Sequence, residues 1–295
     1  MVKSNTKDIK NKNEVKSSLA RETWYRLKKS KLAMLGLYIL IIVIMIALFA
    51  PLIAPHGYDD QNPDTILLTP NREFPLGTDN FGRDILSRMI YGSRITLLVG
   101  AISVSLSWIA GCSLGIIAAY YRKTDNVIMR FIDMISGIPF LLLAIAIGAA
   151  LGSGLFNMTF AVGLSAIPAY ARIARASVLT VMGNEYIEAA RAIGANNKWI
   201  IIRHIIPNSL APMIVQATLG AANAVISASV LSFLGLGIQP PTPEWGAMLS
   251  VGRNYIRDFP HMCIVPGVAL MIVVFALNTL GDGLRDALDP HLKSI

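Results

Sequence analysis

Charged residues are scarce in this 295-residue chain: Asp, Glu, Lys and Arg make up 15% of it, whereas soluble domains carry roughly 25%. Apolar residues make up 54% of the sequence, and its mean hydropathy is +0.56. This composition excludes an ordinary soluble domain and indicates an integral membrane protein. The first apolar run is too long for a signal peptide and follows about thirty polar residues, so we expect it to remain as an anchor.

The residues of most catalytic and cofactor sites are also few or absent. The two cysteines, Cys112 and Cys263, lie in or beside apolar segments and far apart in sequence, which favours buried thiols over a disulfide. The four histidines show no metal-ligand spacing. No GxxxxGKS or GxxxxGKT motif and no Ser/His/Asp or paired-carboxylate arrangement occurs. We therefore expect no metal, no cofactor, no ATP site and no enzyme activity in this chain.

Six apolar stretches are long enough for membrane spans, since crossing the ~30 Å hydrocarbon core takes about 20 helical residues. The stretches lie at about 32–53, 94–121, 134–152, 156–173, 209–234 and 262–281. The fourth is the shortest and is interrupted by Pro168. None of the six contains Asp or Glu in its apolar body, which disfavours a proton- or ion-coupled carrier.

The basic residues predict the orientation of these spans. With the N-terminus inside, 20 of the 26 Lys and Arg residues fall on the cytoplasmic side and six on the outer side. We therefore expect both termini in the cytoplasm and residues 54–93 outside. The net charge of +8 then reflects topology and attraction to anionic lipid, and requires no nucleic acid as a partner.

The sequence predicts one all-α membrane domain, residues 32–295, after a cytoplasmic tail, residues 1–31. Residues 1–18 are polar and expected to be disordered. From residue 19 to 31, Trp24 and Tyr25 stand among basic residues, which suits an amphipathic helix at the membrane surface. A second outer segment, about 235–260, is rich in glycine and proline, and Trp245 is expected to anchor it at the interface.

Small residues recur at every fourth position in three of the predicted spans. Ser103, Ser107, Gly111 and Gly115 form one such line. Residues four apart share a helix face, and small ones let helix backbones approach closely. We expect these lines to pack helices together rather than to form a substrate groove.

Residues 174–208 form a charged cytoplasmic loop between two spans. Good helix formers run from Glu185 to Ile193, and Gly194 can take the left-handed conformation that ends a helix. A second amphipathic run follows, and Pro207 can open the next helix. We expect a helix–turn–helix in which Glu188 offers a carboxylate to a basic residue of another protein. The residues assigned to this docking element are Glu185, Glu188, Ala189, Ala190, Gly194, Ala195 and Pro207. Taken alone, the loop is equally consistent with a solvated connector.

A second distinctive stretch, residues 75–94, precedes the second span. Its glycines predict turns, and Thr78 or Asp79 can cap a helix. From Asp84 onward the apolar residues share one face, which predicts a short helix at the membrane surface. The residues singled out here are Gly77, Thr78, Asp79, Gly82, Arg83, Asp84, Ser87 and Arg88. Without further information this stretch indicates only an ordered entry to a membrane helix.

These two stretches resemble motifs of one transporter family. The Glu188-Ala189-Ala190 run followed by Gly194 is similar to the EAA loop of ABC-importer permeases, although His204 and Ile206 stand where that pattern has Ile and Leu. Residues 75–94 resemble the LGTDxxGRDxxSRxxxGxR stretch of the C-type permease subunit of dipeptide, oligopeptide and nickel importers. Residues 233–237 and 281–290 look like the same family, so the resemblance covers residues 24–290.

The resemblance implies a type I ABC importer permease of the bacterial inner membrane, with six transmembrane helices. It further implies four kinds of partner: a second homologous permease subunit, two cytoplasmic ATPases that bind ATP and Mg²⁺, an extracytoplasmic solute-binding protein and the lipid membrane. A peptide is the expected solute, with nickel, a metallophore or glutathione as alternatives within the family. An ion-coupled secondary carrier and a non-transporting membrane scaffold are the alternatives outside it.

Three amides are the conspicuous polar groups within the spans: Gln216, Asn223 and Asn278. Gln216 and Asn223 are seven residues apart and therefore share a helix face. Hydrogen bonding between helices is the favoured role for such groups. Lining a translocation path is the alternative.

Overall fold

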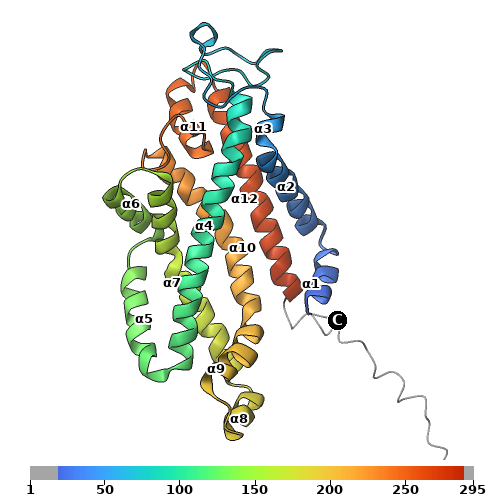
Figure 1. The fold of residues 1–295 in the computed structure, drawn as a ribbon, viewed down its shortest axis with the longest axis vertical. Coiled ribbons are helices and arrows are strands. Elements are labelled where there is room, and N and C mark those ends of the chain that lie inside the picture. Colours follow the sequence, from blue (N-terminus) through green and yellow to red (C-terminus); the bar gives the residue numbers. More distant parts are fainter. Residues whose placement is uncertain (1–18, 289–295) are drawn as a thin grey trace, which may run out of the picture.

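The computed structural model describes residues 19–288, and these residues form a bundle of long helices without a strand (Figure 1). The predicted disorder of residues 1–18 and the segment 289–295 lie outside the described residues. The all-α prediction is confirmed for the described part of the chain. The helices are α1 (Leu19–Leu27), α2 (Lys31–Leu48), α3 (Ala50–Ile53), α4 (Ile85–Tyr120), α5 (Arg122–Ser136), α6 (Phe140–Leu151), α7 (Leu155–Met182), α8 (Glu185–Ala192), α9 (Asn197–Ile200), α10 (Ile206–Phe233), α11 (Trp245–Gly252) and α12 (His261–Leu288).

Four of these helical segments are long and apolar enough to cross a membrane: Lys31–Leu48, Ile85–Tyr120, Asn197–Phe233 and His261–Leu288. The pair α5 and α6 adds a fifth if the two together make one span, and the pair bends by 85°. The predicted third span, 134–152, is therefore not one straight helix. Its break lies at Gly137–Pro139, because proline lacks an N–H and disfavours helical geometry at the residue before it.

The predicted fourth span, 156–173, falls within α7, which is not among these four segments. This helix is 28 residues long and continues past residue 173 to Met182, with Pro168 inside it. It packs along α4 more extensively than any other helix pair in the described structure. The length of α7 and its packing along α4 still make it a candidate for a sixth membrane span.

The second predicted span begins earlier than expected. The separate surface helix predicted at Asp84 does not form, since residues 85–120 make one continuous helix. Asp84 is its N-cap and accepts the backbone N–H groups of Leu86 and Ser87. No proline follows before residue 120. A capped start without a later helix breaker gives one long helix.

The line of small residues in α4 packs closely against another helix, as expected, and that helix is α7. A Cβ atom on Gly111 would lie 2.6 Å from the Tyr170 Cβ atom, and one on Gly115 would lie 2.3 Å from the Ala171 carbonyl oxygen. Two serines of the same line donate hydrogen bonds across the interface, Ser103 to the Thr159 carbonyl at 3.0 Å and Ser107 to the Gly163 carbonyl at 2.7 Å. The prediction of tight helix packing is confirmed here.

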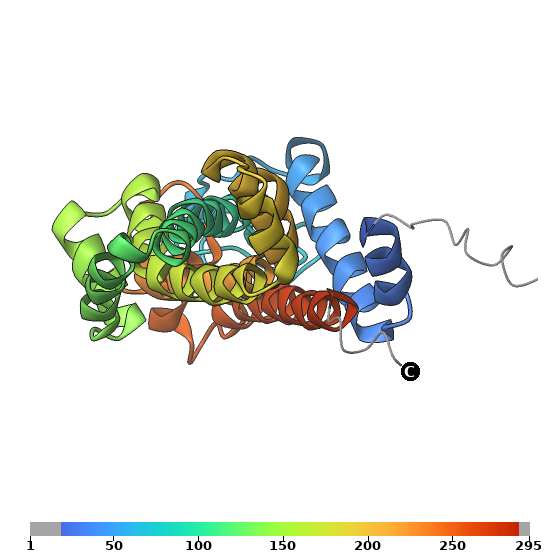
Figure 2. The same cartoon turned by 90° about the horizontal axis from the view of Figure 1, so that it is seen from below.

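The helices leave distinct structures at the two ends of the bundle. Irregular chain before α4 and the segment around α11 cover one end, while α8 and α9 lie at the opposite end (Figure 1). Viewed from below, α12 lies beside α1 and α2 at one side of the bundle, and α5 and α6 lie at the other (Figure 2). A translocation path would have to run from the end that holds α11 to the end that holds α8 and α9.

Candidate functional sites

The outer motif between residues 77 and 88 depends on two glycines with positive φ. Gly77 has φ +78° and Gly82 has φ +73°. A Cβ atom on Gly82 would lie 1.9 Å from the Asn62 carbonyl oxygen, so no other residue fits there. All eight motif residues singled out from the sequence are buried. The motif is therefore an internal brace rather than an exposed recognition surface.

Asp79 holds the centre of this brace. Its Oδ1 atom accepts the backbone N–H groups of Phe81 and Arg83, at 2.8 and 3.1 Å. Its Oδ2 atom lies 2.7 Å from Arg83 Nε and 3.4 Å from Arg88 Nε. Because both guanidinium groups are buried, this single carboxylate offsets much of the cost of removing two positive charges from water.

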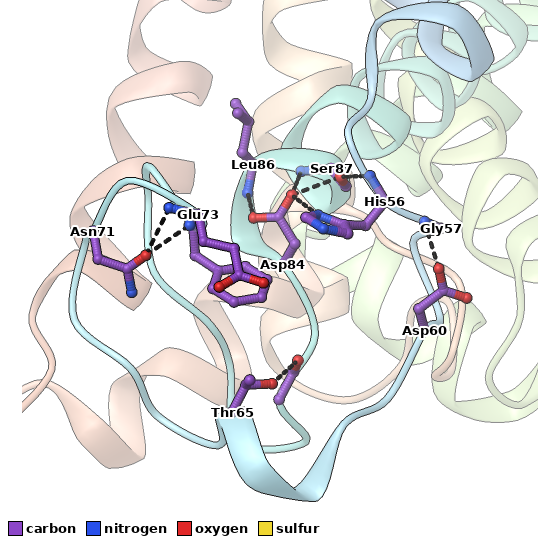
Figure 3. A network of polar contacts seen from close by, with 11 residues as sticks. His56, Gly57, Asp60, Thr65, Asn71, Glu73, Asp84, Leu86 and Ser87 are labelled. Atoms are coloured by element: carbon purple, nitrogen blue, oxygen red, sulfur yellow. Dashed lines mark hydrogen bonds and ion pairs between the residues drawn. The ribbon is translucent and has the colours of Figure 1, made fainter.

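Asp84 and Ser87 tie the brace to the chain at His56 (Figure 3). Ser87 Oγ donates to Asp84 Oδ2 at 2.6 Å and accepts the backbone N–H of His56 at 3.0 Å. The His56 ring nitrogen Nδ1 lies 3.4 Å from the same Asp84 oxygen. The N-cap of α4 thereby fixes a loop that lies some thirty residues earlier in the chain.

Arg88 and Trp245 connect this brace to the second outer segment. Arg88 Nη1 donates to the Tyr58 and Pro241 carbonyl oxygens, at 2.7 and 3.1 Å. Trp245 Nε1 donates to the Met89 carbonyl oxygen at 3.0 Å. The prediction that Trp245 anchors a loop at the membrane surface is wrong, because its side chain is only 3% exposed and packs inside the protein.

At the opposite end, α8 is anchored by one face and exposed on the other. Ile187 and Ala190 are buried against residues that include Val178 and Ile205. Glu185, Glu188 and Ala189 are exposed. Ala190 thus packs within its own chain, whereas Ala189 and the two carboxylates remain free to meet another molecule.

The turn after α8 has the geometry expected of Gly194. Its φ is +80°, and the Ala195 N–H donates to the Ala190 carbonyl oxygen at 3.1 Å. This bond pattern is the Schellman helix end. The turn also exposes Ile193, at 83% of its surface. Ile193 is not among the docking residues predicted from the sequence, although an isoleucine next to a helix-ending glycine is a detectable signal.

Pro207 lies in the first turn of α10, as predicted, but α10 continues directly from a preceding helical turn. The chain is already helical from Asn197, and a π-helical turn, Ile201–Ile205, precedes α10. A proline inside a helix lacks the N–H that would bond the carbonyl four residues earlier. The wider turn just before it accommodates that missing bond, as π-bulges commonly do.

A cavity of about 500 Å³ lies between α4, α7, α10 and the bend that joins α5 to α6. Gln216 and Asn223 line it from α10. Asn278 does not line it, and is exposed on α12. Within residues 19–288, none of the three amides makes a hydrogen bond to another helix. Hydrogen bonding between helices, the favoured role for these amides, is therefore not observed in the described part of this chain.

Two ion pairs join α5 to α7, and one of them includes a residue that lines this cavity. Arg175 pairs with both carboxylate oxygens of Asp125 at 2.6 Å. Arg172, which lines the cavity, pairs with Asp133 at 2.8 Å. The positive charge nearest to the cavity is thereby matched by a carboxylate.

No group of three or more His, Cys, Asp or Glu side chains suited to a metal ion occurs between residues 19 and 288. Cys112 and Cys263 are free thiols.

Comparison with protein families gives two matches. Residues 111–294 match the model described as "Binding-protein-dependent transport system inner membrane component". Residues 18–70 match the model described as "N-terminal TM domain of oligopeptide transport permease C". The two matches together cover most of the chain and leave residues 71–110 between them.

Curated relatives are similar over nearly the full length. The chain is 48% identical over 275 residues to the dipeptide transport system permease protein DppC of Alkalihalophilus pseudofirmus, which covers 93% of this chain and 90% of that protein. It is 43% identical to the di/tripeptide transport system permease protein DppC of Pseudomonas aeruginosa, over 93% of both chains. It is also 43% identical to the glutathione transport system permease protein GsiD of Pectobacterium atrosepticum, over 93% of this chain and 92% of that one.

Solved structures share the fold. A chain from the inward-facing MetNI methionine ABC transporter aligns with a TM-score of 0.57 at 20% identity, over 70% of this chain and 98% of that one. A chain from an amino acid ABC transporter crystallised with histidines aligns with a TM-score of 0.54 at 15% identity, over 68% and 94%. The helical arrangement described above is thus one already known from ABC transporters.

Proposed function

The chain belongs to the family of binding-protein-dependent transport system inner membrane components, and from this premise we propose that it forms half of an import path for dipeptides. As a family member it is a permease subunit of an ABC importer in the bacterial inner membrane. ATP hydrolysis belongs to separate ATPase subunits, and solute is delivered by a binding protein.

Dipeptides are the first candidate solute because two of the relatives, at 48% and 43% identity, carry that name or the di/tripeptide name. Glutathione is the second candidate, since the named glutathione permease is also 43% identical over nearly the whole chain. Both solutes are short peptides. Nickel and metallophores, the other solutes considered from the sequence, have no support from these relatives.

The six-span topology remains part of the proposal, with both termini in the cytoplasm. Four single segments and the bent pair α5–α6 supply five spans, and we assign α7 as the sixth because it packs along α4 and is 28 residues long. The 20-to-6 distribution of basic residues supports this orientation.

Cysteine labelling tests this topology. Gln61 and Lys198 are exposed, and no hydrogen bond to either side chain occurs in the described structure, unlike the capping residues Asn62 and Asn196. Single cysteines at these two positions should react with a membrane-impermeant maleimide from opposite sides of the membrane. Labelling of both from the same side contradicts the topology.

We assign ATPase docking to α8 and the turn that follows it. The anchored face of Ile187 and Ala190 holds the helix on the bundle, while Glu185, Glu188 and Ala189 stay exposed. Such an element transmits movement to the helices with little loss, because its own contacts are buried. Closure of the ATPases on ATP then rotates the bundle and opens the path outward, and hydrolysis returns it to the inward-facing state.

A heterodimer with a second, homologous permease completes the proposed complex. The cavity between α4, α7, α10 and the bend that joins α5 to α6 is not fully enclosed by this chain, so a second subunit is needed to close a path around solute. Gln216 and Asn223 line the half that this chain contributes.

Uptake by the purified complex in proteoliposomes tests the function. The complex with its ATPases and loaded binding protein should accumulate radiolabelled Ala-Ala only when ATP is enclosed with the ATPases. Uptake by the permeases alone, driven by an ion gradient, would instead favour a secondary carrier. No uptake of either Ala-Ala or glutathione by a fully assembled complex with ATP would favour a scaffold.

A further inference from the structure

The free polar groups of the cavity follow one face of α10. Gln216, Gly220, Asn223 and Ser227 all line it, at spacings of four, three and four residues that keep them on the same side of the helix. At 1.5 Å per residue, the row from Gln216 to Ser227 is about 16 Å long. It therefore extends over about half of the ~30 Å hydrocarbon core.

Other hydroxyl groups around the cavity are already committed to the protein. Four serines that line it donate to backbone carbonyl oxygens at 2.7–3.0 Å: Ser103, Ser107, Ser136 and Ser165. By contrast, the side chains of Gln216, Asn223 and Ser227 make no hydrogen bond within residues 19–288. The α10 row is thus the part of the lining whose donors and acceptors remain available.

A fourth polar group lies at the middle of this row, after Gln216, Asn223 and Ser227. The Tyr170 hydroxyl is buried and has no hydrogen-bond partner within the described structure. It approaches the row at Gly220, where a Cβ atom would lie 2.0 Å from the Tyr170 oxygen. A buried hydroxyl without a partner is costly unless something else satisfies it.

The available groups are all neutral. The one charged residue that lines the cavity, Arg172, is paired with Asp133 at 2.8 Å. A lining of amides and hydroxyls can both donate to and accept from a peptide bond, which presents one N–H and one C=O. It offers no uncompensated charge with which to select or reject charged side chains.

Resting on the proposed import of peptides, we propose that the α10 row binds the peptide bond of the solute and is indifferent to its side-chain charge. Gln216 and Asn223 are about 10 Å apart along the helix axis, farther than one peptide bond extends. They therefore bind the same peptide bond one after the other and not at the same time. Selection by charge is then left to other parts of the complex.

A charge introduced at one of these two amide positions provides the sharpest test. The complex is reconstituted with its binding protein at saturating load, and uptake of Ala-Ala, Ala-Lys and Ala-Glu is measured for each variant. Because the binding protein is the same throughout, its own preferences cancel when a variant's uptake ratio is divided by that of the unmodified complex.

Asn223→Asp should raise the Ala-Lys to Ala-Glu uptake ratio more than about fivefold, because a carboxylate in the cavity attracts one side chain and repels the other. Asn223→Leu should lower uptake of all three dipeptides by a common factor of about two to ten, the effect of one neutral hydrogen bond. Asn278→Asp is the matched control: the same change at an exposed amide of α12 outside the cavity should leave the ratio unaltered.

A ratio that stays within twofold after Asn223→Asp overturns the inference, as does an equal shift in the Asn278→Asp control. An unmodified complex that hydrolyses ATP but takes up none of the three dipeptides overturns the proposed function itself. Uptake of dipeptides that is insensitive to Asn223 overturns only the assignment of the row.

Discussion

Removal of the Asp79 carboxylate should destabilise the outer end of the protein severely. Asp79→Ala leaves the guanidinium groups of Arg83 and Arg88 buried without the charge that lies 2.7 and 3.4 Å from them. It also removes the acceptor for two backbone N–H groups. Removing one partner of a buried ion pair costs about 3–5 kcal/mol. For a chain of this size we therefore expect the Tm to fall by about 6–20 °C.

The assay is thermal unfolding of the purified complex in detergent, followed by intrinsic tryptophan fluorescence, because Trp245 lies on the segment that the brace holds. Asp79→Asn separates the two contributions, since it keeps an oxygen for the backbone N–H groups but removes the charge. Asp64→Ala is the control, an exposed carboxylate of the same outer segment expected to change the Tm by no more than about 2 °C. A similarly small change for Asp79→Ala would refute the argument that this carboxylate compensates two buried charges.

Two further changes test other parts of the structure. Gly194→Val places a β-branched residue at φ +80°, which costs about 1–3 kcal/mol of local strain; it should weaken ATPase recruitment in co-purification while Gly183→Val, at an ordinary φ of −75°, does not. Burial raises the pKa of Glu244, the N-cap of α11, so its protonated form is favoured in the folded state. Its contribution to stability is present below the unfolded-state pKa and is lost as pH rises through the raised pKa. The Tm of the unmodified protein should therefore fall between pH 5 and 8 by more than that of Glu244→Gln, and equal slopes would contradict this.

Local signals in the sequence predicted the parts of the structure that depend on neighbouring residues. The helix from Glu185 and its end at Gly194 follow from helix formers and one glycine within a single turn. The close packing along one face of α4 follows from small residues spaced by four, although the identity of its partner, α7, does not. The shared face of Gln216 and Asn223 follows from a spacing of seven, although what lies opposite them does not.

The predictions that failed depended on residues distant in sequence, or on hydropathy averaged over a whole span. The Trp245 indole bonds a carbonyl 156 residues away, so its burial has no local signal. Arg88 likewise reaches Pro241 across 153 residues. The break at Pro139 was missed because hydropathy averaged over the span 134–152 does not register a single helix-breaking residue. The burial of the motif around Asp79 was missed because, like the burial of Trp245, it depends on residues distant in sequence.

Charge reversal at Glu188 tests the central claim most directly: that this permease is driven by ATPases through the exposed face of α8. The measurement is ATP hydrolysis stimulated by dipeptide-loaded binding protein, together with Ala-Ala uptake, in the reconstituted complex. Glu188→Lys should weaken ATPase binding about tenfold or more and abolish most stimulated hydrolysis and uptake, with an unchanged Tm of the permease. Glu73→Lys, the same change on the outer segment, should leave both activities intact. Normal recruitment, hydrolysis and uptake in Glu188→Lys would contradict the account.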